Sequence, residues 1–151
     1  MAPKSRLTPF EQQRQTWCKA GHSVLANGHH GMDEGLRAWA RRSGRLVWID
    51  RRSLWGNPHE PDAPTDDVQR QRVVQQYAVW LETQPDLLTG LDVLAGKVLV
   101  CWCTPRICHG EVLLEHLDPQ FAAAYIAVCQ EHLGRPVRPL GTTPMQQLSL
   151  F

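Results

Sequence analysis

A short run of residues near position 105 holds the side chains in this chain with the most chemical potential. It reads Cys101-Trp102-Cys103-Thr104-Pro105-Arg106-Ile107-Cys108-His109-Gly110, so three thiols and an imidazole lie close together in sequence. A continuous apolar stretch, residues 97–102, predicts a buried strand before the run, and a helix is expected to begin near Gly110. Ligands of open α/β sheets bind outside the carboxyl ends of the strands, so a site is expected here.

Three interpretations of these cysteines stay open. In the first, Cys101, Cys103, Cys108 and His109 hold zinc, for which thiolate and imidazole are common ligands, although paired C-x2-C spacing is missing. In the second, Cys108 is a catalytic thiolate stabilised by the helix N-terminus, with His109 and Cys103 as further catalytic residues. In the third, the cysteines are core residues, as expected for Cys101 on a buried strand and for Cys129 on an apolar helix face.

A second polar loop follows the other clear strand, residues 45–50. It carries Arg51, Trp55, Asn57 and His59. In a parallel sheet this loop and the cysteine loop meet at one edge, so these side chains and Arg106 are expected to line one pocket. Arginines beside a helix N-terminus favour an anionic ligand such as a nucleotide phosphate. The alternative for Asn57 is an ordinary turn, in which its side chain bonds its own backbone.

The elements that position these loops can be predicted from caps and apolar spacing. Thr8, Pro9 and Glu11 predict a helix start, and that helix should end near Lys19. Further helices are expected over about 33–43, 65–82, 85–94, 110–117 and 118–134, while residues 22–32 read as a loop. Strands separated by helices predict a single small α/β domain, Rossmann-like, with two or three layers and a short, mostly parallel sheet. Only two strands are clear, so one or two more must lie within the apparent loops.

The 151 residues divide by pattern into an N-terminal helix and loop (1–32), an α/β domain (33–134) and a flexible tail (135–151). The chain has no apolar run near twenty residues and no signal-peptide pattern, so we expect a cytoplasmic protein with no membrane partner and with reduced or metal-bound cysteines. Its net charge of +1 gives no bulk attraction to nucleic acid. Basic residues between Arg37 and Arg52 form either a phosphate-facing patch or a solvated face.

The last five residues, Gln147-Leu148-Ser149-Leu150-Phe151, follow a stretch rich in proline and glycine. Three apolar side chains at such an end expose surface that a soluble monomer normally hides. Their order resembles the motif by which bacterial proteins dock on the ring-shaped DNA sliding clamp. The resemblance implies that Gln147 makes polar contacts, while Leu148, Leu150 and Phe151 fill an apolar pocket of the clamp. The alternative is a tail that folds back onto the domain's own core.

Residues 45–117 resemble the domain of unknown function 4326 family of small bacterial and phage proteins. The matching pieces include Trp55-Gly56-Asn57-Pro58, Cys101-Trp102-Cys103 and Cys108-His109-Gly110. Asp50 departs from the pattern, where a small residue is expected before the arginine. The resemblance implies one α/β domain and no established reaction.

These features lead to one main functional hypothesis and two alternatives. The main one is an accessory protein recruited to replicating or repaired DNA by the sliding clamp, whose Cys/His/Arg/Asn pocket binds or processes a nucleotide or another nucleic-acid-related anion. One alternative is a non-enzymatic adaptor or competitor that only occupies the clamp. The other is a structural zinc protein that associates with DNA. Whether the chain is an enzyme is left open.

Overall fold

The structure is a computed structural model that describes residues 6–59 and 66–133. The clamp-binding peptide, Gln147–Phe151, and the predicted helix cap Thr65 lie outside the described residues.

The centre of the molecule is a sheet of three parallel strands in the order β1-β3-β2. These are β1 (Val24–Asn27), β2 (Leu46–Trp48) and β3 (Val98–Cys101). Every residue of β1 and β3 is buried, as expected for strands covered on both faces. The sheet confirms the α/β class. The prediction of a loop over residues 22–32 was wrong for β1, which is short and owes its conformation to pairing with β3.

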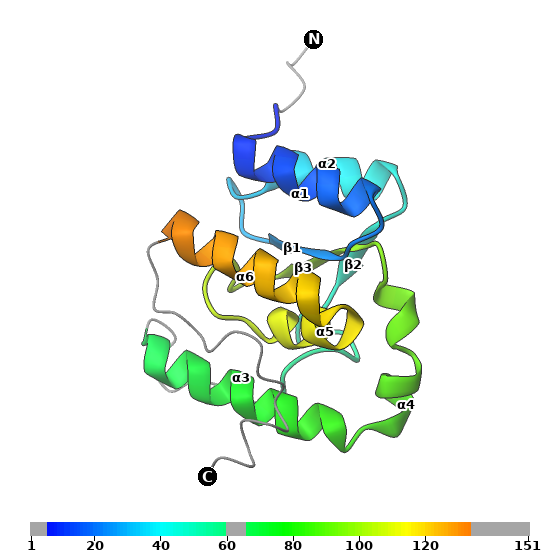
Figure 1. Cartoon of the computed structure of the whole chain (residues 1–151), viewed down its shortest axis with the longest axis vertical. Coiled ribbons are helices and arrows are strands. Elements are labelled where there is room, and N and C mark those ends of the chain that lie inside the picture. Colours follow the sequence, from blue (N-terminus) through cyan, green and yellow to red (C-terminus); the bar gives the residue numbers. More distant parts are fainter. Residues whose placement is uncertain (1–5, 60–65, 134–151) are drawn as a thin grey trace.

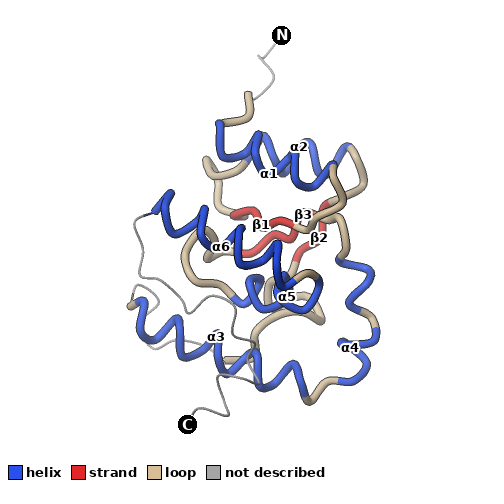
Figure 2. The backbone as a smooth tube through the Cα atoms, in the orientation of Figure 1, coloured by secondary structure: helices blue, strands red, loops and turns tan. Residues whose placement is uncertain are grey.

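Helices cover both faces of this sheet and make a three-layer domain (Figure 1). One face is covered by α1 (Pro9–Lys19) and α2 (Glu34–Arg42), and the other by α5 (His109–Leu117) and α6 (Pro119–Leu133). The connection from β2 to β3 contains α3 (Asp67–Glu82), α4 (Pro85–Thr89) and the 3-10 helix η1 (Leu91–Leu94). In Figure 2 the strands lie between these layers, and α3 packs against α5.

Side-chain caps mark where α1, α3 and α5 begin. The capping box predicted for α1 is confirmed, because the Thr8 hydroxyl accepts from the Glu11 N–H and the Glu11 carboxylate accepts from the Thr8 N–H. Asp66 caps α3 by accepting from the Val68 N–H. Cys108 caps α5, with its sulfur accepting from the Gly110 N–H. The cysteine loop is therefore fixed to the start of a helix.

Buried hydrogen bonds join α6 to the edge strand β1. Tyr125, from α6, uses its hydroxyl to accept from the Leu25 N–H at 3.1 Å and to donate to the Leu25 carbonyl at 3.2 Å. This satisfies the backbone of β1 along its free edge.

No helix in the described ranges has the length and apolar character needed to span a membrane.

Candidate functional site

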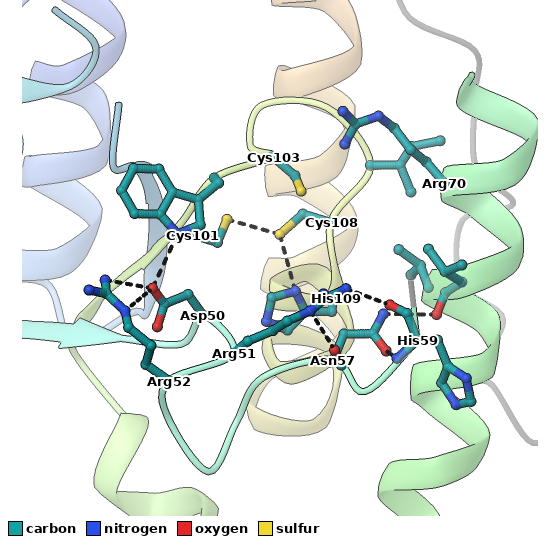
Figure 3. Close-up of a pocket in the computed structure, with 14 residues that line it drawn as sticks. Asp50, Arg51, Arg52, Asn57, His59, Arg70, Cys101, Cys103, Cys108 and His109 are labelled. Carbon is teal, nitrogen blue, oxygen red and sulfur yellow. Dashed lines mark hydrogen bonds and ion pairs between the residues drawn. The ribbon is translucent and has the colours of Figure 1, made fainter. Parts of the chain in front are cut away.

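A cavity of about 460 Å³ opens at the carboxyl ends of β2 and β3. Its walls come from the loop after β2, the loop after β3 and the N-terminal half of α3 (Figure 3). The described residues that line it are Asp50, Arg51, Arg52, Asn57, His59, Arg70, Val73, Val74, Cys101, Trp102, Cys103, Ile107, Cys108 and His109. The structure thus brings together most of the side chains expected to share a pocket.

Three cysteine sulfurs converge at the deep end of this cavity. Figure 3 shows Cys101 and Cys103 pointing toward Cys108 from two sides. The Sγ atoms of Cys101 and Cys108 lie 2.9 Å apart. Both of these residues are buried, whereas Cys103 is half-buried. Cys18 and Cys129 are buried elsewhere, on α1 and α6, in agreement with the core role expected for Cys129.

His109 is buried at the cavity wall and contacts the backbone after β2. Its Nε2 lies 2.7 Å from the Ile49 carbonyl oxygen, and because a carbonyl oxygen can only accept, Nε2 carries the hydrogen. Burial lowers the pKa of His109 to about 4, so the ring is neutral near pH 7. The unprotonated Nδ1 then lies 3.7 Å from the Cys108 sulfur. This arrangement ties the end of β2 to the first turn of α5.

The environment separates the protonation states of the thiols. Contacts with the Cys101 and Cys103 sulfurs, together with burial, raise the pKa of Cys108, so this residue is a thiol at neutral pH. A hydrogen bond from Cys108 and the nearby charge of Arg70 lower the pKa of Cys103 to about 6. The thiolate is therefore favoured at Cys103, the more accessible sulfur, and not at the helix cap Cys108, where the sequence led us to expect it.

The loop after β2 is held by its own polar groups. Arg51 donates from Nε to the Asn57 carbonyl and from Nη2 to the His59 carbonyl, each at 3.2 Å. Asn57 accepts from the His59 N–H at 2.9 Å and donates to the Val73 carbonyl at 3.0 Å. The Asn57 side chain therefore forms the turn that was considered as an alternative and also anchors the loop to α3. Arg51 and His59 remain on the cavity wall.

Asp50 links the two loops, and this contact explains why the position before Arg51 holds Asp where a small residue was expected. Its Oδ2 accepts from Arg52 at 2.7 Å and from the Trp102 indole N–H at 3.1 Å. Burial opposes its ionisation, but the hydrogen bonds and charge of Arg52 hold the pKa of Asp50 below its usual range. The carboxylate thus stays charged and holds the indole of Trp102, which lines the cavity.

Arg70 is a charged wall residue on α3 that sequence reasoning missed. It reaches from α3 toward Cys103, across the cavity from the loop after β2 (Figure 3). Its position continues the buried helical stripe of Val74, Tyr77 and Leu81 one turn toward the N-terminus. The helical spacing of Arg70 relative to this stripe could have indicated its position. A charged residue one turn beyond an apolar stripe lies on the same helix face, at the edge of the surface that the stripe covers.

Two predicted ligand residues are not brought to the cavity. Trp55 is in the core, where its carbonyl accepts from the Tyr77 hydroxyl at 2.8 Å. Arg106 is exposed on the cysteine loop and is not one of the lining residues. As for zinc, no group of three or more His, Cys, Asp or Glu within residues 6–59 and 66–133 is arranged to hold a metal ion.

Gly56 supports this loop by close backbone packing, and replacing it tests the loop's rigidity. A Cβ at this position would lie 2.5 Å from the Arg51 Cα and 2.6 Å from the Asp50 carbonyl oxygen. Both are backbone atoms, so Gly56→Ala must displace the loop and should lower the free energy of unfolding by about 1–3 kcal/mol. Urea unfolding measures this. Leu54→Ala, on the same loop but highly exposed, should change it by less than about 0.5 kcal/mol; equal effects would contradict the packing argument.

The fold and the cavity define a small three-layer α/β protein with a ligand-sized site at the carboxyl edge of a parallel sheet. A family model described as domain of unknown function (DUF4326) matches residues 35–119, more than half of the chain. The chain therefore belongs to the DUF4326 family. No curated protein and no solved structure matches it.

Proposed function

We propose that the α/β domain binds a nucleotide-sized anion in the cavity beside Cys103, and that the C-terminal peptide Gln147–Phe151 brings the domain to the bacterial sliding clamp on DNA. The observation that carries the first half is the composition of the cavity wall. Three arginines and His59 line the cavity with a single carboxylate, that of Asp50, and the rest of the described wall is largely apolar.

The size of the cavity supports a small organic anion over a bare ion. Ligand pockets typically enclose about 300–1,000 Å³, and this one encloses about 460 Å³. The apolar wall of Val73, Val74 and Ile107 suits a ring such as a nucleobase or sugar. The arginines suit phosphate, which guanidinium groups bind through paired N–H donors.

Arg70 is the best single probe of this proposal. Arg52 is engaged by Asp50, and Arg51 holds the backbone of its own loop, so Arg70 is the arginine that approaches the cavity from a separate element. In isothermal titration calorimetry, Arg70→Gln should weaken binding of a nucleoside monophosphate about tenfold to a hundredfold, the usual cost of losing a charged hydrogen bond. The unphosphorylated nucleoside should be much less affected.

The matched control is Arg72→Gln. Arg72 lies on the same helix, is exposed and does not line the cavity, so its loss changes the net charge equally without touching the wall. The affinity of Arg72→Gln for the nucleoside monophosphate should stay within about twofold of that of the parent chain. The proposal fails if both variants weaken binding alike, or if the nucleoside binds as tightly as the nucleotide.

The second half of the proposal concerns the tail, and its support is the sequence of the terminal peptide. A tether raises the local concentration of the domain at DNA without requiring DNA affinity of its own. The net charge of +1 is consistent with that arrangement.

A further inference from the structure

The three converging thiols form a group that anion binding does not use. Cys108 is the centre: the Cys101 sulfur lies 2.9 Å away, and the Cys103 side chain points toward it from the other side (Figure 3). Cys101 and Cys108 are about 1% exposed, and Cys103 lines the cavity and is half-buried. A cluster with one accessible sulfur and one buried neighbour has the layout of a reactive thiol and its resolving partner.

We propose that Cys103 and Cys108 are a modification site for hydroperoxides, in which Cys103 is oxidised first and Cys108 closes a disulfide with it. The inference goes beyond the proposed function and does not depend on it. Two features of the wall favour Cys103 as the first reactant: its sulfur is open to the cavity, and the charge of Arg70 lies beside it.

The chemistry balances with the peroxide as the only co-reactant. The Cys103 thiolate attacks one peroxide oxygen, an S–O bond forms as the O–O bond breaks, and the alkoxide or hydroxide that leaves takes a proton from solvent. Cys103 is then a sulfenic acid. The Cys108 sulfur attacks it, an S–S bond forms, the S–O bond breaks, and the departing hydroxide takes the Cys108 proton to give water. Overall, two thiols and one organic hydroperoxide give a disulfide, an alcohol and one water. With hydrogen peroxide the products are a disulfide and two waters.

Backbone freedom favours Cys108 with Cys103 over Cys108 with Cys101. A disulfide requires a narrow range of Cα separations and dihedral angles. Cys101 is the last residue of β3 and is held in register opposite Asn27. Cys103 lies on the loop between β3 and α5, which can adjust without breaking the sheet ladder.

The test is peptide mass spectrometry of the full chain after limited hydrogen peroxide, with a 1,3-diketone present to trap sulfenic acid. The parent chain should lose two thiols and yield the Cys103–Cys108 disulfide. Cys108→Ser should stop at the trapped sulfenic acid on Cys103. Cys103→Ser should react at least about tenfold more slowly, whereas Cys129→Ser, at a buried site on α6, should react like the parent.

Three outcomes overturn the proposal. One is a disulfide between Cys101 and Cys108 with Cys103 left free. Another is an unchanged oxidation rate in Cys103→Ser. The third is stoichiometric zinc in the purified chain, by elemental analysis, together with thiols that resist peroxide. Mapping the disulfide in the oxidised parent chain, as Cys103–Cys108 or Cys101–Cys108, decides the case even if a serine variant does not fold.

Discussion

A chain that ends at Thr143 should show no measurable binding to the bacterial sliding clamp, whereas the full chain should bind it in the micromolar range. Burial of Leu148, Leu150 and Phe151 is worth roughly 5–8 kcal/mol before costs. Ordering a peptide that follows several prolines and glycines removes part of that gain. Calorimetry of both chains with purified clamp measures the difference, which should exceed a hundredfold or so in dissociation constant.

Single substitutions locate the effect within the peptide. Leu150→Ala and Phe151→Ala should each weaken binding strongly, because each removes an apolar anchor. Leu140→Ala, upstream of the motif, is the matched control and should bind like the parent. Arg70→Gln should also bind the clamp normally, which keeps the tether separate from the cavity. Clamp binding by the chain that ends at Thr143 would refute the tether.

The largest stability effect is expected at Arg14. This side chain is 3% exposed and donates to both carboxylate oxygens of Asp33, at 2.6 and 3.0 Å. It also donates to the Leu25 carbonyl at 2.9 Å, while Asp33 accepts from the Asn27 N–H at 2.8 Å. One ion pair thus connects α1, the backbone of β1 at Leu25 and Asn27, and the start of α2.

Removing one partner of a buried pair leaves the other charge without compensation. Arg14→Met should therefore lower the free energy of unfolding by about 3–5 kcal/mol, measured by denaturant titration. Arg41→Met, at an exposed position of α2, should cost less than about 0.5 kcal/mol. The double variant Arg14→Met with Asp33→Asn should cost less than the sum of the single variants. If Arg14→Met unfolds at the parent's midpoint, the pair has no such role.

Local chemistry made much of the fold predictable. The Thr8 and Glu11 capping box is a signal confined to four residues, and it marks the start of α1 correctly. β1 was missed because its four residues show no alternation and follow a loop-like pattern, while its strand conformation depends on β3, more than seventy residues away. Local pattern cannot report a partner that distant.

The candidate site was likewise predictable only in part. The meeting of the two loops follows from parallel strands, which the apolar runs indicated. Arg70 could not be placed, because its contribution depends on how α3 packs across the sheet edge. The state of each thiol was equally hidden, since it depends on which sulfur lies deepest and which lies near an arginine.

The strand order β1-β3-β2 has a consequence for how this chain is made. In the described sheet β1 and β2 do not pair with each other; each pairs with β3, which comes last of the three in sequence. On the ribosome, no strand ladder of this sheet can form until β3 has emerged. The nascent chain therefore carries two apolar segments with unpaired backbone groups through most of its synthesis. β3 completes the sheet and ends at Cys101, so the cysteine loop leaves the ribosome directly after the strand that pairs these segments.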